Sequence, residues 1–172
     1  ATPEPTATPE PTATRTPLPC TTFEPNADLA DCNLSRETLG GKDLSGANLR
    51  SANLTGAILD GTNLSGADLT SAVMTNADLT DADLSDAIMV GVNFRGADLT
   101  DAVLDNADLE KADFSDAILE DASLKGTNLL DAKFIGAEMK GANLDSAIIV
   151  GIRLLDAKMR SVTLTNLIMD RM

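Results

Sequence analysis

A large apolar residue occupies every fifth position of this chain from Leu29 to Met169, without one insertion or deletion. The series has 29 consecutive members, most of them Leu and the others Met, Ile or Phe. A period of five fits neither the 3.6 residues per turn of an α-helix nor the two-residue alternation of a plain β-strand. The chain therefore has to change direction once in every repeat, which excludes an ordinary globular fold.

The residue two positions after each large apolar residue marks the turn. Eleven of the 12 glycines occupy this slot, and Gly40 is the exception. Asp, Asn and Ser fill most of the other slots, and all of these residues tolerate turn or left-handed backbone. Ala usually lies two positions before the large apolar residue. We therefore expect each pentapeptide to form a short extended side and a corner, with Ala and the large apolar residue pointing inward.

These pentapeptides resemble the pentapeptide repeat family, whose signature is Ala, then Asp or Asn, then Leu and two variable residues. The motif is present as Ala-Asp-Leu at 67–69, 77–79, 82–84, 97–99 and 107–109, and as Ala-Asn-Leu at 47–49, 52–54 and 142–144. The resemblance covers 27–169. It implies an all-β fold, a right-handed quadrilateral β-solenoid of about seven 20-residue coils. The chain departs from the pattern at Glu37, Lys42, Ile152, Val162 and Leu167, near the two ends.

Two spacings in the sequence bear on the length of a coil. Phe94, Phe114 and Phe134 recur with a period of 20, so a four-sided coil stacks them on one side, whereas a three-sided coil scatters them. An outward apolar series has a period of 15, at Ile58, Val73, Ile88, Val103, Ile118 and Ile148. We assign the longer period to the coil and the shorter one to a duplication of three pentapeptides, because buried bulky side chains constrain stacking more than surface ones do. The outward series then forms a spiral that could be a docking groove.

Residues 1–25 differ sharply from the repeats. They contain all seven prolines and a tandem ATPEPT sequence, which predicts an extended, polyproline-like arm or linker before a solenoid domain at 26–172. A disordered stalk is the alternative interpretation of this segment. Cys20 and Cys32 flank the junction and are candidates for a disulfide, with two free thiols or an intermolecular bridge as alternatives. A disulfide, a Thr/Pro arm and a first residue other than Met are typical of an extracellular or cell-surface protein whose signal sequence has been removed.

Composition excludes several functions. The chain has no His, Trp or Tyr and no nucleophile motif, so we expect no enzyme, no catalytic residue, no cofactor and no small-molecule substrate. A net charge of −14 opposes binding to nucleic acid, and no apolar stretch is long enough for a membrane span. Asp81, Asp101 and Asp121 also recur with the four-sided period and form a weak candidate metal column, for a calcium-type cation. A solvated acidic face is the simpler interpretation of that column.

The C-terminal end has the composition of an assembly interface. Its candidate residues are the apolar Leu155, Val162, Leu167, Ile168, Met169 and Met172 and the basic Arg153, Lys158, Arg160 and Arg171. Residues 26–120 hold 18 acidic and 5 basic side chains, whereas 121–172 hold 6 acidic and 7 basic ones. Opposite potentials at the two ends favour an oriented encounter of one copy with the next.

We expect an extracellular structural protein that assembles with itself, head to tail, into filaments. The solenoids stack at their ends, and the N-terminal arm of one copy docks on its neighbour. One alternative comes from the resemblance, because some family members are similar to duplex DNA in shape and charge and bind DNA gyrase, which protects it from quinolones. Another alternative is a monomeric surface adhesion or spacer module.

Overall fold

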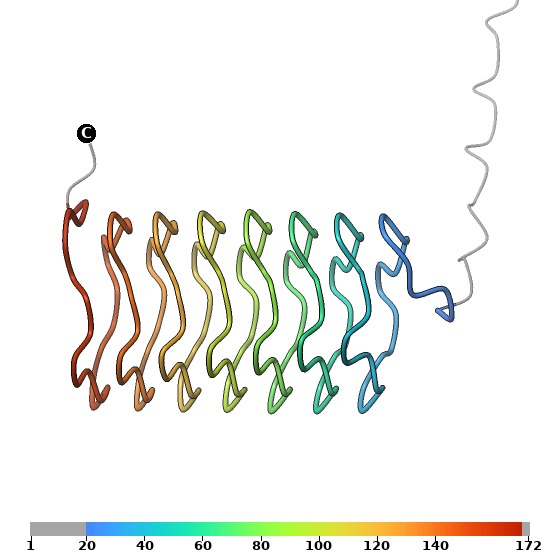
Figure 1. The fold of residues 1–172 in the computed structure, drawn as a ribbon, viewed down its shortest axis with the longest axis horizontal. Coiled ribbons are helices and arrows are strands. Elements are labelled where there is room, and N and C mark those ends of the chain that lie inside the picture. Colours follow the sequence, from blue (N-terminus) through green and yellow to red (C-terminus); the bar gives the residue numbers. More distant parts are fainter. Residues whose placement is uncertain (1–19, 170–172) are drawn as a thin grey trace, which may run out of the picture.

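A computed structural model describes residues 20–169, and they form one continuous β-solenoid (Figure 1). Each side of a coil contributes a single bridge residue, and 20–169 contain neither a longer strand nor a helix. All bridges are parallel and join equivalent positions of successive coils, from Asp28 with Asn48 to Ile148 with Ile168. This register makes every coil a square of four pentapeptides and rules out a three-sided coil.

The corners lie where the glycine pattern predicts them. Every fifth residue from Asn26 to Asn166 has a positive φ, and glycine occupies eleven of these positions. Lys111 also adopts this conformation, with φ of 60°. At most corners a backbone N–H donates to the carbonyl of the preceding large apolar residue, as Ala47 does to Leu44 at 3.0 Å. The corner prediction is therefore confirmed for the repeats.

Gly40, the one glycine outside the corner slot, has a different role. A Cβ atom at this position would lie 2.3 Å from Oδ1 of Asp60, in the next coil. The absence of a side chain at Gly40 leaves room for that carboxylate. A close approach, and not a positive φ, explains this glycine.

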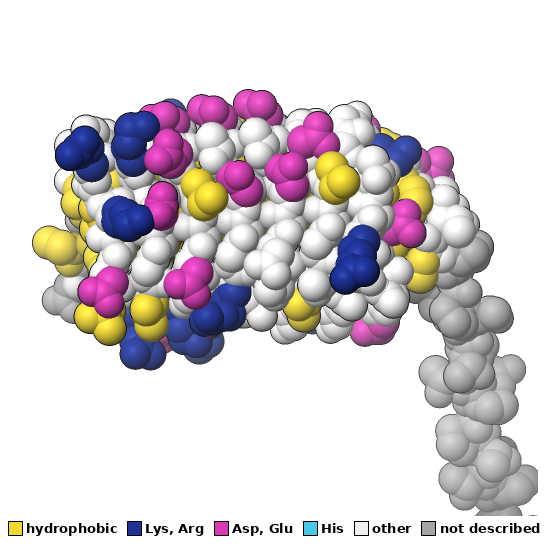
Figure 2. All heavy atoms as spheres, turned by 90° about the horizontal axis from the view of Figure 1, so that it is seen from below, with side chains coloured by type: hydrophobic (Ala, Val, Ile, Leu, Met, Phe, Trp, Pro, Cys, Tyr) yellow, Lys and Arg dark blue, Asp and Glu magenta, His cyan; other side chains and the backbone are white. Residues whose placement is uncertain are grey.

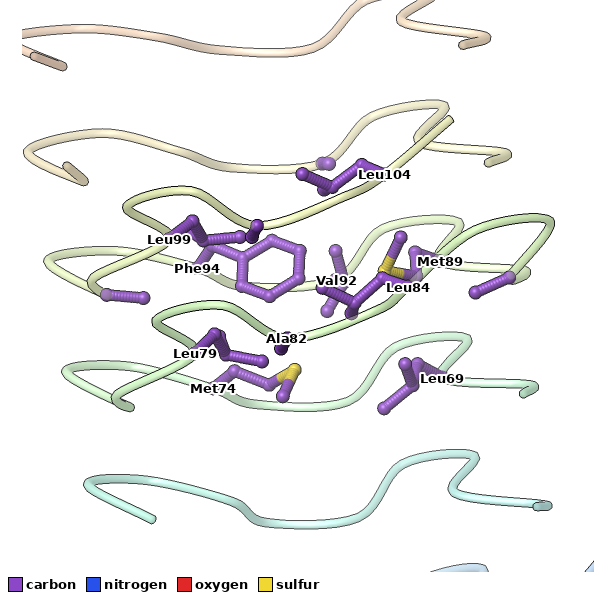
Figure 3. Close-up of a cluster of buried hydrophobic side chains, with 14 of the residues drawn as sticks. Leu69, Met74, Leu79, Ala82, Leu84, Met89, Val92, Phe94, Leu99 and Leu104 are labelled. Atoms are coloured by element: carbon purple, nitrogen blue, oxygen red, sulfur yellow. The ribbon is translucent and has the colours of Figure 1, made fainter. Parts of the chain in front are cut away.

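The interior is a column of buried apolar side chains, most of them Ala and Leu. Figure 3 shows part of it, with Met74 beneath Phe94 in the same column. The rings of Phe94 and Phe114 stack with centroids 5.0 Å apart, and those of Phe114 and Phe134 with centroids 4.8 Å apart. Where Thr62 replaces Ala, its hydroxyl donates to the carbonyl of Leu39 at 3.0 Å. Within 20–169, no buried side-chain nitrogen or oxygen lacks a hydrogen-bond partner.

The two departures from the pattern near the N-terminus do not disturb the coil. The N–H groups of Glu37 and Lys42 donate to the carbonyls of Leu34 and Leu39 at 3.1 Å each, as alanines do elsewhere. Their side chains are exposed at the N-terminal end of the solenoid, because no coil lies before the first one. The corner geometry depends on the backbone, so a polar side chain is tolerated at the end.

Candidate interaction site at the ends of the solenoid

The N-terminal end of the solenoid is closed by the segment 20–25, which we call the N-terminal cap. A disulfide joins Cys20 to Cys32 in the first coil, with Cα atoms 5.8 Å apart. Cys20 and Phe23 pack against the core, and Nζ of Lys42 lies 5.8 Å from the centroid of the Phe23 ring. The large apolar residues of the first coil are consequently at most 1% exposed: Leu29, Leu34, Leu39 and Leu44.

The C-terminal end is open in the region that the structure describes. Leu164 and Met169 occupy the same inward series as the first leucines, yet they are 47% and 72% exposed. Leu154 and Met159 are only partly buried. The two ends of the rod are therefore unequal, because one core end is sealed and the other meets solvent. The sequence predicted that solenoids stack at their ends, and the structure adds that the N-terminal end carries a cap.

The backbone of the last coil is open as well. In the coil before it, the N–H groups of Phe134, Met139 and Leu144 donate to carbonyls of the last coil, at 2.7, 2.9 and 2.9 Å. The equivalent N–H groups of Leu154, Met159 and Leu164 have no hydrogen-bond partner among residues 20–169. The carbonyls of Ile152, Ala157 and Val162 accept no hydrogen bond there either. Three sides of this end thus present both donors and acceptors, as an edge strand does.

Basic side chains gather towards the same end, on the face that Figure 2 shows. A shallow depression near this end is lined by Glu120, Glu138, Lys140, Lys158, Met159 and Arg160. Nζ of Lys140 lies 3.3 Å from a carboxylate oxygen of Glu120, and Lys158 pairs with Glu138. In each pair a lysine neutralises the glutamate one coil before it. The depression therefore holds two ion pairs and one further cation, Arg160.

The structure places the other candidate residues as follows. Leu155, Ile168 and Met169 are exposed, while Val162 and Leu167 are partly buried in the inward slot of the last coil. Arg153, Lys158 and Arg160 point outward and are exposed. Arg171 and Met172 lie outside the described residues, as do residues 1–19 of the expected arm.

The acidic column at Asp81, Asp101 and Asp121 consists of corner residues with φ of 57°, 57° and 56°. The N–H of Asp81 donates to the carbonyl of Thr100, and that of Asp101 to the carbonyl of Glu120. Among residues 20–169, no group of three or more Cys, Asp or Glu side chains is arranged to hold a metal ion. These carboxylates lie at successive corners of the acidic surface.

Other carboxylates hold the coils in register. Burial raises the pKa of Asp68, but hydrogen bonds from Thr70 and Arg50 outweigh it, so its pKa is lowered. The pKa of Asp145 is lowered by hydrogen bonds from Thr165 and Asn166, one coil further on. Asp145 therefore ties the last coil to the one before it.

The N-terminal cap is the functional feature that sequence reasoning missed. Residues 20–25 lie before the first repeat, so no periodicity marks them. One signal was available, because Phe23 is the only Phe outside the column of three and lies close to Cys20 in the sequence.

The described residues form a regular square β-solenoid. Nothing in the described part indicates catalysis, and 20–169 hold no helix that is long and apolar enough to cross a membrane. The family model for pentapeptide repeats matches eight copies, over residues 27–66, 47–86, 77–116 and 112–149, so the chain belongs to the pentapeptide repeat family. Members of this family fold as right-handed quadrilateral β-helices and are generally structural or protein-binding proteins without enzymatic activity.

Solved structures of this family are similar to the chain. One is HetL, a pentapeptide repeat protein involved in heterocyst differentiation regulation from the cyanobacterium Nostoc sp. strain PCC 7120, with 30% identity over 84% of both chains and a TM-score of 0.40. Another is full-length QnrB1, a plasmid-mediated fluoroquinolone resistance protein, with 16% identity over 85% of both chains and a TM-score of 0.61. The likeness to QnrB1 shows the fold alone. No curated protein matches the chain.

Proposed function

We propose that this protein is a structural protein of the cell exterior whose copies join head to tail into filaments. One observation carries the proposal, namely the inequality of the two ends. The first leucines are at most 1% exposed, whereas Leu164 and Met169 at the other end are 47% and 72% exposed. An open apolar end with unpaired backbone donors and acceptors favours a protein partner.

The charges favour a second copy in head-to-tail orientation as that partner. Residues 150–169 carry three basic side chains and one acidic one, whereas 20–45 carry five acidic and two basic ones. A head-to-tail contact brings the basic end to an acidic end, and a two-fold contact between two C-terminal ends brings like charges together. A contact of this heterologous kind generates a filament when it does not close into a ring.

The presence of the cap changes how the two ends meet. The cap fills the N-terminal core opening, so the open end of one copy meets the cap and the arm of the next and not a bare coil. About seven coils at about 4.8 Å give a rod of about 35 Å, and one cap layer adds a few ångströms to the axial repeat. An extracellular location fits the Cys20–Cys32 disulfide, because oxidising compartments preserve such bonds.

Sedimentation velocity of the full chain and two matched variants tests the proposal. Met169→Glu places a charge at the open end, at a side chain that is already 72% exposed in the single copy. Ile58→Glu makes the same change at a 42% exposed side chain in the second coil, far from the open end. We expect the unchanged protein and I58E to form large species at micromolar concentration, and M169E to sediment as a monomer. Equal sedimentation of M169E and the unchanged protein would contradict the proposal.

The two alternative functions give different results in the same experiment. A monomeric adhesion or spacer module sediments as one copy at all concentrations, with or without the substitutions. A gyrase-binding protein inhibits supercoiling by purified gyrase, and its acidic middle coils, rather than Met169 alone, govern that inhibition. Either outcome would replace filament assembly as the function.

A further inference from the structure

The lateral surface of the described rod holds a contiguous apolar patch, on the side that begins with Asp28. It adjoins the open C-terminal end. We call it the lateral patch, and its residues are Leu130, Ile148, Val150 and Ile168. Ile168 is 44% exposed, and the other three side chains are half-buried. Ile148 and Ile168 form a β-bridge, and the N–H of Asp131, next to Leu130, donates to the carbonyl of Val150 at 2.9 Å. The four side chains therefore lie on adjacent coils of one side.

The patch lies on a side whose earlier outward positions are mostly polar. In earlier coils the outward bridge slot of this side carries Asp28, Asn48, Asp68, Asp108 and Asn128, with Ile88 as the one apolar residue. Only the last two coils carry Ile at consecutive levels, Ile148 and Ile168. Apolar residues that replace polar ones at the outer surface, next to an open end, indicate a covered surface.

The outward apolar series with a period of 15 does not form such a surface. Ile58 lies between Thr38 and Asp78, and Val73 lies between Asn53 and Asn93 on the bridge ladders. Ile88 and Val103 likewise have polar neighbours on both sides of the ladder. Each of these four residues lies on a different side of the square and has no apolar neighbour along its own ladder, so the ladders do not support the expected docking groove. Ile148 is the one member of the series that belongs to the lateral patch.

We propose that the lateral patch binds residues 17–19, Pro-Leu-Pro, of the neighbouring copy. This inference rests on the proposed head-to-tail assembly and names the surface that the N-terminal arm occupies there. The sequence before Cys20 supplies the matching chemistry, with two prolines that have no N–H to satisfy and one Leu. A proline-rich segment is extended before it binds and does not need to pair as a strand.

The distance from Cys20 to the lateral patch favours the arm of a neighbouring copy over the arm of the same copy. The disulfide holds Cys20 beside Cys32 in the first coil, and Ile168 is bridged to the last full coil at the opposite end. The arm of the same copy has to run back along about 35 Å to reach the patch. In a head-to-tail contact, Cys20 of the next copy arrives at the open end, and residues 17–19 span about 9 Å from there.

Photo-crosslinking of the full chain tests the inference. Leu18 is replaced by the photoreactive amino acid p-benzoylphenylalanine, and isotopically heavy and light copies are mixed before irradiation. We expect cross-links between heavy and light chains that map to residues 130–168. The double variant I148N/I168N should lower their yield at least tenfold, and its asparagines match Asn48 and Asn128 on the same side. Ile88→Asn, the same change outside the patch, should leave the yield unchanged.

The outcomes separate the inference from the proposed function. If the chain assembles but Leu18 cross-links only within its own copy, or to coils before residue 130, the docking site is wrong and the assembly stands. If I148N/I168N and I88N give the same yield, the lateral patch is likewise not the site. If the chain remains monomeric in sedimentation, both the assembly and the docking site are wrong.

Discussion

Replacement of Phe114 by alanine removes the middle ring of the aromatic column, and the structure gives its cost. Phe114 is fully buried between Phe94 and Phe134, with centroid distances of 5.0 and 4.8 Å. Loss of a buried Phe side chain costs about 3–5 kcal/mol, because the lost transfer energy and the cavity add. Each ring pair accounts for about 0.5–1.5 kcal/mol beyond the area that it buries.

Two further variants separate these contributions. Phe114→Leu keeps most of the volume and matches Leu154, two coils further along the same column, so we expect it to cost mainly the two ring contacts, about 1–3 kcal/mol. Ile88→Asn changes an exposed outward side chain and should stay within about 0.5 kcal/mol. Urea denaturation followed by circular dichroism measures all three free energies of unfolding. A cost below about 1 kcal/mol for F114A, or equal costs for F114A and I88N, would refute a tightly packed column.

Three further changes test the cap, the corners and the carboxylates. Cys32→Ala places the alanine that is usual in the inward slot and removes the disulfide, so we expect the free energy of unfolding to fall by about 3 kcal/mol. Chymotrypsin should then cleave the bond after Phe23. A cap that stays uncleaved would contradict the closed N-terminal end. Gly91→Ala should lower the free energy of thermal unfolding by about 1–2 kcal/mol because φ is 66° at this corner. A clash does not contribute, since the nearest atom to an added Cβ, Oγ of Ser71, is 4.0 Å away. Gly91→Asn should cost much less, and equal costs would contradict the left-handed corner. Asp145→Ala should lower the melting temperature by a constant amount above about pH 4. The difference in melting temperature between the variant and the unchanged protein should vanish as the pH falls through the lowered pKa of Asp145, because the carboxylate stabilises the fold only when it is ionised. A difference that persists at pH 2 would show that Asp145 acts without its charge.

Sequence alone predicts the repeat architecture because each pentapeptide forms the same short side and the same corner. The five-residue period and the glycine slots define the corners, and the spacing of Phe94, Phe114 and Phe134 gives the coil length. Each of these features depends on contacts between equivalent positions of successive coils, and a period in the sequence identifies those positions. The all-β solenoid of the pentapeptide repeat family follows from them.

The ends are harder to predict because they lie where the period stops. The cap depends on Phe23 and on the contact of Cys20 with Cys32, and the sequence left the pairing of these cysteines open. The lateral patch also needed the bridge register, since Ile148 and Ile168 become neighbours only when the coil length is known. By contrast, the apolar and basic character of the C-terminal end was visible in composition.

Negative-stain electron microscopy of the purified full chain tests the central claim most directly. Head-to-tail assembly through the open end predicts unbranched filaments with a width of one solenoid and an axial repeat of about 35–40 Å, the length of seven coils and one cap. The Met169→Glu variant should show only single short rods. Isolated rods of the unchanged protein, or closed pairs that meet at their C-terminal ends, would contradict the account.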